Sequence, residues 1–339
     1  MMKRMIALAA ALLLSLTLLA GCAGTPDAES SVPESSAPAY EPVDVKITAI
    51  AGPTGVGLVG LMQKQTDKTA ANNYTFNVVS DPTQAVAAIS NGSADIAAVP
   101  TNLASTLYKK TGGKVQVLAV NTLGVLHILE NGETISTVAD LRGKTIYTSG
   151  QGANPEYILK YVLEKNNIDP EKDVTIQFVA DNDTLATLVA NGTAKVAMVP
   201  EPKATACLIQ NTAVRRVLNM TEEWEKVADD DSALMMGCVV ARTAFVQENP
   251  EAVAKFLEEY KASINAVVAD VENASKLCVT YGIIPKAPIA KQAIPNCGLV
   301  YVDGVEMKTQ LAAYLAILHG YNPAAIGGEL PANAFYYAG

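Results

Sequence analysis

The sequence predicts an α/β protein with two lobes, each built on a mainly parallel sheet that is flanked by helices. From about Val43 onward, strand-like and helix-like segments alternate along the chain, which is typical of parallel strands joined by crossover helices. The phrase NGSADIAAVP at 91–100 recurs as NGTAKVAMVP at 191–200, so each half repeats a helix end, a short buried strand and a proline. About 295 residues are available for folding, which is enough for two lobes.

The first half begins with the β-branched run Val45–Ala51, which predicts a strand. Helical spacing of apolar residues follows at Gly57–Lys68. The same alternation then predicts strands at 74–80, 94–99 and 115–121, and helices at 83–90 and 103–110.

The second half repeats this order of elements. The triplet Asn154-Pro155-Glu156 predicts a helix start, with Asn as the cap, Pro in the first turn and an acid beside the positive end of the helix dipole. We expect this helix to run to about Asn166. The other expected elements are strands at 143–149, 174–180, 194–199 and 214–220, and helices at 183–190 and 203–210.

The C-terminal third departs from the alternation. A buried strand is expected at 234–242, and Asn249-Pro250-Glu251 predicts the start of a long helix to about Asp270. Further helices are expected at 271–281, 287–293 and 304–319. We expect these helices to return and pack on the first lobe.

The N-terminus has the features of a signal peptide at 1–21, in which Lys3 and Arg4 precede the apolar run Met5–Leu19. That run is too short and too weakly flanked for a stable membrane span. The following LAGC resembles the bacterial lipoprotein cleavage box, in which Cys22 becomes the lipidated first residue and anchors the protein to the cell membrane. Residues 22–44 are rich in Ser, Pro, Ala and Glu and are expected to form a flexible linker.

The composition narrows the functional class. The formal net charge is −9 at pH 7 and basic clusters are absent, which argues against nucleic-acid binding. The cysteines after Cys22 have no CxxC spacing, so we expect buried free thiols and no metal. His127 is expected to be a packed strand residue, and His319 ends a predicted helix, where a cation suits the dipole. The sequence has no GxSxG or HExxH motif, and no GK[ST] follows the glycine-rich stretch at 55–60, so we expect neither an enzyme nor a cofactor.

A GxGxxG pattern at 55–60 follows the first predicted strand, with Asp81 about twenty residues later. This arrangement matches a dinucleotide-binding fingerprint and leaves a dinucleotide-dependent oxidoreductase as an alternative. Against it, residues 52–54 lengthen a turn that the fingerprint needs to be tight, and the chain carries an export signal. The pattern also fits small residues that let the helix pack closely on the sheet, or free helix-start amides that hold a ligand oxygen.

Small and polar residues gather in the loops that follow the predicted strands, where open α/β sheets bind ligands. These loops lie at 52–55, 81–83, 100–102, 148–152, 181–183 and 200–202. Two facing lobes would bring both sets of loops to one cleft. The candidate ligand-binding residues are Thr54, Gly55, Asp81, Thr101, Asn102, Ser149, Gln151, Asn154, Tyr157 and Glu201.

The segment at 140–176, DLRGKTIYTSGQGANPEYILKYVLEKNNIDPEKDVTI, resembles the second-lobe opening of solute-binding proteins of ABC importers, of the NMT1/THI5-like and sulfonate/nitrate-binding type. The two NG…VP phrases and NPEAVAKFLEEYKASI at 249–264 resemble further parts of this family. The resemblance implies the type II periplasmic-binding-protein fold, in which two segments cross between lobes. We place the crossings near 123–126 and 234–240, so that lobe 1 comprises 45–123 and 240–339, and lobe 2 comprises 124–239.

The resemblance further implies a lipid-anchored, extracytoplasmic solute-binding component of an ABC importer. Its partners would be a small-molecule solute, a permease with its ATPase and the membrane, and we expect a monomer. Closure of the lobes over the solute follows from contacts that exist only when both lobes touch it. A sensor or adhesion lipoprotein with the same fold but no importer is an alternative.

The identity of the solute is the open question at this stage. Because a buried carboxylate needs a donor or a cation, we expect an amine, amidine or aminopyrimidine group that faces Glu201, unless Glu201 merely caps its helix. Ser149, Gln151 and Asn102 would hold the polar edges of the solute, and Tyr157 would stack on a ring. A sulfonate- or nitrate-type anion is the alternative solute.

Overall fold

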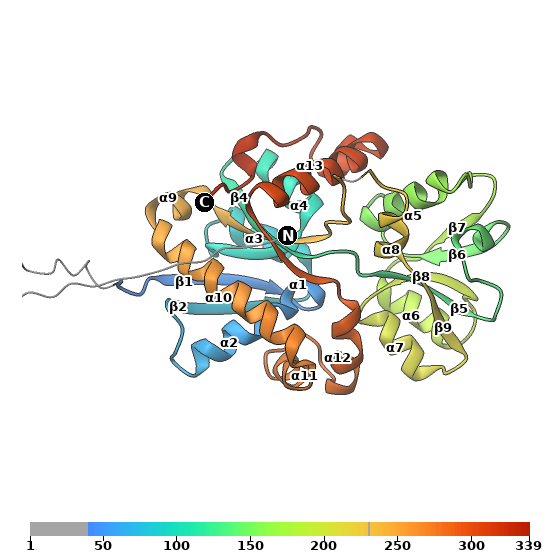
Figure 1. The fold of residues 1–339 in the computed structure, drawn as a ribbon, viewed down its shortest axis with the longest axis horizontal. Coiled ribbons are helices and arrows are strands. Elements are labelled where there is room, and N and C mark those ends of the chain that lie inside the picture. Colours follow the sequence, from blue (N-terminus) through green and yellow to red (C-terminus); the bar gives the residue numbers. More distant parts are fainter. Residues whose placement is uncertain (1–39, 230) are drawn as a thin grey trace, which may run out of the picture. The chain divides into compact units, whose positions relative to one another are not determined.

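Two sheets, one of six strands and one of five, form the framework of residues 42–339 in a computed structural model (Figure 1). The structure describes residues 40–229 and 231–339. The predicted signal peptide at 1–21, the predicted lipid acceptor Cys22 and most of the predicted linker at 22–44 lie outside these residues. Within the described ranges, no helix has the length and the apolar character that a membrane crossing requires.

The first sheet has the strand order β11-β4-β10-β3-β1-β2. Its strands are β1 (Asp44–Ile50), β2 (Asn73–Val79), β3 (Ile96–Pro100), β4 (Val115–Thr122), β10 (Gly237–Arg242) and β11 (Leu299–Val302). Strand β1 pairs in parallel with β2 and β3, whereas β10 lies antiparallel between β3 and β4. The four strands of the first half therefore run in one direction, as the sequence predicts, and β10 is inserted among them.

The second sheet repeats this arrangement with the order β7-β6-β8-β5-β9. Its strands are β5 (Leu126–Asn131), β6 (Thr145–Thr148), β7 (Thr175–Phe178), β8 (Val196–Pro200) and β9 (Val214–Asn219). Here β5 is the strand inserted antiparallel, between β8 and β9. Each inserted strand follows a passage between the sheets, which the chain makes between Thr122 and Leu126 and again between Asn219 and Gly237. Strand β10 begins before the predicted lobe boundary at 240, and the lobe boundaries remain a prediction.

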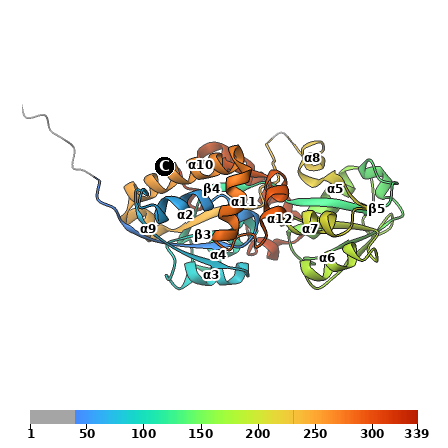
Figure 2. The same ribbon diagram turned by 90° about the horizontal axis from the view of Figure 1, so that it is seen from below.

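Helices cover the faces of both sheets (Figures 1 and 2). They are α1 (Pro53–Val56), α2 (Val59–Thr66), α3 (Pro82–Ser90), α4 (Thr101–Lys110), α5 (Asn154–Lys165), α6 (Asn182–Ala190), α7 (Lys203–Gln210), α8 (Met220–Glu225), α9 (Thr243–Glu248), α10 (Pro250–Ala269), α11 (Val271–Thr280), α12 (Ala287–Ala293) and α13 (Gly304–Tyr321). The predicted helix at 57–68 corresponds to α2, whereas α1, α8, α9 and β11 are not predicted from the sequence. These missed elements are short, so their periodic signal is weak.

The C-terminal helices return to the first sheet, as expected. Phe256 and Tyr260 of α10 share a buried cluster with Val45 and Ile47 of β1. Two of these helices also contact the second half, because α12 packs against α7 and α13 packs against α5. Figure 2 shows α12 beside α7. The C-terminal third therefore links the two halves as well as completing the first one.

The repeated NG…VP phrase forms the same corner in both halves. Asn91 and Asn191 each cap the end of a helix and accept a hydrogen bond from the backbone N–H two residues later, at 2.9 and 3.0 Å. Gly92 and Gly192 follow with φ of 76° and 79°, a left-handed conformation that glycine adopts without strain. A buried strand and a proline complete each corner. The predicted duplication is therefore confirmed at the level of backbone conformation.

The GxGxxG pattern serves helix packing. A Cβ on Gly57 would lie 2.8 Å from Cγ1 of Ile264, and one on Gly60 would lie 2.7 Å from Oγ of Ser263, both on α10. The Ser263 hydroxyl donates to the Gly57 carbonyl at 2.6 Å. A Cβ on Gly55 would lie 2.3 Å from the Ile50 carbonyl oxygen of β1. Close packing against the sheet is thus confirmed at Gly55, which lies against the end of β1. Gly57 and Gly60 instead pack against helix α10.

The thiols and imidazoles occupy the places that the sequence predicts. The cysteines after the leader are all free and buried, namely Cys207, Cys238, Cys278 and Cys297. His127 is buried in β5, and His319 lies in the last turn of α13.

Candidate functional site

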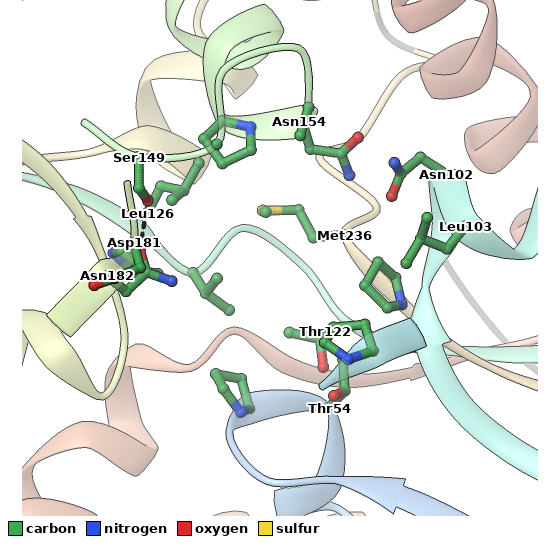
Figure 3. A pocket seen from close by; sticks show the side chains of 18 of the residues that line it. Thr54, Asn102, Leu103, Thr122, Leu126, Ser149, Asn154, Asp181, Asn182 and Met236 are labelled. Atoms are coloured by element: carbon green, nitrogen blue, oxygen red, sulfur yellow. Dashed lines mark hydrogen bonds between the residues drawn. The ribbon is translucent and has the colours of Figure 1, made fainter. Parts of the chain in front are cut away.

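A cavity of about 480 Å³ lies between the loops at the carboxyl ends of the two sheets (Figure 3). This volume falls within the range of small-molecule sites, which is about 300–1,000 Å³. Its polar side chains come from both halves of the chain: Thr54, Asn102, Thr122, Ser149, Asn154, Asp181 and Asn182. The rest of the wall is mostly apolar, with Leu103, Leu126, Met236 and a series of prolines. A mostly apolar wall with a few convergent polar groups is the usual form of a ligand site.

The repeated corners place equivalent residues on opposite walls. Strands β3 and β8 end in Pro100 and Pro200, and both prolines line the cavity. Helices α3 and α6 begin after Asp81 and Asp181, whose carboxylates accept the backbone N–H of Thr83 at 2.8 Å and of Thr184 at 2.7 Å. These backbone hydrogen bonds lower the pKa of both aspartates, so both remain ionised at neutral pH. Only Asp181 also lines the cavity.

Four of the residues proposed from the sequence line the cavity: Thr54, Asn102, Ser149 and Asn154. Asp81 and Gln151 are exposed outside it, and Gly55, Thr101, Tyr157 and Glu201 are buried and do not line it. Four further lining residues are not among those proposed from the sequence: Thr122, Asp181, Asn182 and Met236. A signal for Asp181 was present, because it stands one hundred residues after Asp81, at the same offset as the two NG…VP phrases.

Glu201 is engaged within the protein. The residue is only 3 % exposed, and its carboxylate forms an ion pair with Arg216 and accepts the Thr205 backbone N–H at 3.2 Å. Burial raises the pKa of Glu201, and the adjacent Arg216 opposes that shift. This placement removes the basis for the predicted contact between Glu201 and a solute amine, because the protein's own guanidinium already occupies the carboxylate.

Tyr157 and Thr101 also have partners within the chain. The Tyr157 hydroxyl accepts a hydrogen bond from Nδ2 of Asn322 at 2.8 Å, and its ring stacks on Tyr321 with 5.9 Å between centroids. Thr101 donates its hydroxyl to the Met235 carbonyl at 2.6 Å. The ring that stacks on Tyr157 is therefore a side chain from α13, where the sequence analysis expected a solute.

The hydrogen bonds of the lining residues decide which atoms remain for a ligand. Thr122 donates its hydroxyl to Oδ1 of Asn121 at 2.9 Å, and Ser149 donates to Oδ1 of Asn182 at 2.5 Å. Nδ2 of Asn102 points to the Ala325 carbonyl at 3.4 Å. These bonds commit the hydroxyl protons of Thr122 and Ser149 and one of the two Nδ2 protons of Asn102. Each of these residues therefore has an oxygen acceptor left for a ligand, and Asn102 also keeps one N–H donor.

The charge of the cavity wall also favours ligands that donate hydrogen bonds. Among the residues that the structure describes, no Lys, Arg or His side chain lines it, and its one charged side chain is Asp181. Asp181 is exposed and caps α6, so its carboxylate stays at the rim of the cavity. The site therefore favours neutral or positively charged ligands with N–H donors.

His127 and the partly exposed Arg216 form a polar cluster with the buried Glu201. Nε2 of His127 lies 3.2 Å from the Asn296 carbonyl and 3.8 Å from Glu201. Burial, followed by the positive charge of Arg216, lowers the pKa of His127 to about 4. The imidazole is therefore neutral at physiological pH and acts as a packed core residue, as predicted.

Comparison with known proteins supplies the context for this cavity. The sequence profile of a family described as "ABC transporter, phosphonate, periplasmic substrate-binding protein" matches residues 58–269. The putative binding protein YtlA of Bacillus subtilis is 25 % identical over 123 residues, which cover 36 % of this chain and 34 % of that relative. The matched region thus spans about a third of that relative's length.

Solved structures share the fold at low sequence identity. An ABC transporter protein from Parabacteroides distasonis has a TM-score of 0.74 and 20 % identity, over 86 % of this chain and 98 % of that chain. The aliphatic sulphonate binding protein SsuA of Escherichia coli has a TM-score of 0.69 and 14 % identity, over 88 % and 92 %. The alkanesulfonate-binding protein SsuA of Xanthomonas axonopodis, bound to MOPS, has a TM-score of 0.61 and 16 % identity, over 88 % and 98 %. These similarities establish the two-sheet fold.

Proposed function

Because this chain belongs to the phosphonate family of periplasmic substrate-binding proteins of ABC transporters, we propose that it captures a small organic solute that is neutral or positively charged and rich in N–H donors. The family consists of binding proteins, so the chain is a solute-binding component and not an enzyme. The oxidoreductase alternative is thereby set aside, and its glycine motif packs against α10 and β1 instead.

The observation that carries this proposal is the set of acceptor atoms in the cavity. Thr122, Ser149 and Asn102 offer oxygen lone pairs, and Asp181 adds the one charge of the wall. A phosphonate, sulfonate or nitrate brings a negative charge, so it would face these oxygens and an ionised carboxylate, with carboxamide N–H groups as donors but no cationic side chain to balance the charge. An amine, amidine or amide instead supplies the protons that these acceptors need.

The two-sided construction of the cavity supports capture by closure. Asn102 and Thr122 belong to the first half, and Ser149 and Asp181 belong to the second. A solute that contacts both sets gains its full binding energy only when the halves approach each other, so it shifts the balance toward the closed form. The closed form would then present the solute to a permease and its ATPase, to which the chain would bind as a monomer.

A lipid anchor at Cys22 completes the proposed arrangement. A charged start, an apolar run and Ala-Gly before Cys22 support export and lipidation. The lipid would hold the protein at the cell membrane, and the linker at 22–44 would leave the folded part free to meet the permease. Replacing Cys22 with Ala in cells should release the protein from the membrane fraction, and retention there would contradict the anchor. Membership of the NMT1/THI5-like group stays a prediction.

Calorimetric titration with matched solutes tests the proposed solute class. We expect saturable binding with amines, amidines or aminopyrimidines, and none with methylphosphonate, ethanesulfonate or nitrate at equal concentration. Asp181→Asn should weaken the binding of a cationic solute by roughly tenfold, because it removes the charge of the cavity wall while Asn still caps the helix. Asp81→Asn is the control, since Asp81 caps the equivalent helix outside the cavity. Preferential binding of the oxyanions would overturn the proposal.

A further inference from the structure

Asn154 is a buried polar residue of the cavity wall without an internal role. It is the first residue of α5, only 4 % exposed, and its Oδ1 has no hydrogen-bond partner among the described residues. The sequence predicts it as the helix cap, and this prediction is wrong. Ala153 occupies the cap position, without a side-chain cap hydrogen bond, and the Glu156 carboxylate accepts the Gly152 N–H at 2.7 Å instead.

An unpaired buried carbonyl destabilises the folded chain, so native proteins rarely retain one without a reason. Asn154 is not held there by capping, and it lines the cavity. Its missing partner is therefore expected to come from a bound molecule. That molecule must bring an N–H or O–H group to Oδ1, and it meets the Nδ2 donor at the other end of the same carboxamide.

Asn102 stands on the other wall and complements this residue. It lies at the start of α4 in the first half and is 8 % exposed. One Nδ2 proton points to the Ala325 carbonyl, so Oδ1 and the second Nδ2 proton are left for a ligand. Figure 3 shows the side chains of Asn102 and Asn154 pointing toward each other. The two helix starts thus place one carboxamide from each half around the same part of the cavity.

We propose that Asn102 and Asn154 together recognise a carboxamide or urea group on the solute, an inference that rests on the proposed solute-binding function. Oδ1 of Asn102 accepts one N–H of that group, Nδ2 of Asn154 donates to its carbonyl, and Oδ1 of Asn154 accepts another N–H. A carboxylate has no N–H to give, and a simple amine has no carbonyl to receive. Only a group that carries both on one edge satisfies all of these atoms.

Matched probes on common skeletons test this assignment. Each set contains a carboxamide, the corresponding carboxylate and the corresponding amine, for example nicotinamide, nicotinate and 3-(aminomethyl)pyridine, with parallel sets on pyrimidine and pentyl skeletons. We expect the carboxamide of at least one set to bind the full-length protein at least tenfold more tightly than both of its partners. Tighter binding of an amine would overturn this inference but leave the proposed function standing. Tighter binding of a carboxylate, or no binding by any probe, would overturn both.

Variants supply a second readout that is independent of ligand choice. Asn154→Leu should lose the tenfold preference for the carboxamide, and the ligand-free variant should melt at a higher temperature than the wild type, because the orphaned carbonyl is gone. Asn154→Asp keeps the size and should likewise lose the preference if Leu does not fold. Gln151→Ala, in the same loop but outside the cavity, is the control. An unchanged preference in both Asn154 variants would overturn the assignment.

Discussion

The two halves of the molecule share a backbone design and differ in the side chains that it carries. After each repeated corner, the residue that follows the proline donates its backbone N–H to a segment that passes between the sheets. Thr101 donates to the Met236 carbonyl at 3.1 Å, and Glu201 donates to the Val125 carbonyl at 2.9 Å. In each sheet, the backbone N–H at this position therefore binds a segment that passes between the sheets, whichever side chain the residue carries.

The side chains at this position have diverged in chemistry. Thr101 adds a neutral hydrogen bond to Met235, whereas Glu201 is a buried carboxylate that depends on Arg216. The inserted strands differ in the same way. Cys238 of β10 lies opposite Val99, and His127 of β5 lies opposite Val199, in equivalent registers. The first half therefore has a neutral interior at these positions, and the second half contains a cluster of titratable groups.

The largest difference between the halves should appear when the side-chain interactions of Thr101 and Glu201 are removed. Arg216→Met leaves Glu201 buried without its counter-charge and is expected to lower the free energy of unfolding by about 3–5 kcal/mol. The matched change in the first half, Thr101→Val, removes one neutral hydrogen bond and should lower the free energy of unfolding by about 1 kcal/mol. Urea denaturation measures both. Equal losses would show that the Glu201–Arg216 pair is no more important than the hydroxyl.

The response to acid should come from the second half. The pKa of His127 is lowered from 6.5 to about 4 by burial, so the unfolded chain binds a proton that the folded chain excludes. The stability from this group is full above pH 6.5 and is lost as pH falls toward 4, by up to about 3 kcal/mol. Replacing His127 with Cys, the equivalent residue of the first half, should flatten this part of the pH profile.

Urea denaturation of the wild type and of His127→Cys at intervals from pH 7 to pH 4 measures this effect. Carboxyl groups away from His127 contribute equally to both profiles, so the difference between the profiles reports the imidazole together with its contact to Glu201. Two parallel profiles would exclude His127 as the cause.

A smaller effect is expected where the C-terminal segment joins the halves. Tyr157→Phe removes the hydrogen bond from Asn322 to α5, and Ser105→Ala removes the 2.7 Å hydrogen bond from α4 to the Ile326 carbonyl. Each substitution should lower the free energy of unfolding by about 1 kcal/mol. Tyr157→Phe should also enlarge the radius of gyration in small-angle scattering, because that bond links the two halves. A change of the same size in Ser105→Ala would contradict this assignment.

The smallest effects are expected at the two equivalent caps. Asp81→Ala and Asp181→Ala each remove one helix cap and should each lower stability by about 1 kcal/mol. Thermal melting should not distinguish them. Solute binding should distinguish the two variants, because only Asp181 lines the cavity. Equal binding by both variants would place the solute away from this wall.

Part of the site followed from the sequence because the signals are local. The loops after β1, β3 and β6 and the duplicated corner were visible as short patterns, and they led to Thr54, Asn102, Ser149 and Asn154. Glu201 and Tyr157 come from equally suggestive positions but face inward. Their partners decide this: Arg216 stands on β9, which β5 separates from the strand before Glu201, and Asn322 lies 165 residues beyond Tyr157. A pattern of a few residues contains no information about such partners.

The sequence by itself determined the alternation of strands and helices, the two repeated corners and the buried thiols, because periodicity, left-handed glycines and apolar character act within one turn or one strand. The tertiary structure alone decided that β10 and β5 are inserted into the sheets, that α10 closes on the glycines, and which polar groups are left for a ligand. Those outcomes depend on contacts between distant segments, where packing and hydrogen-bond satisfaction select among side chains that look alike in sequence.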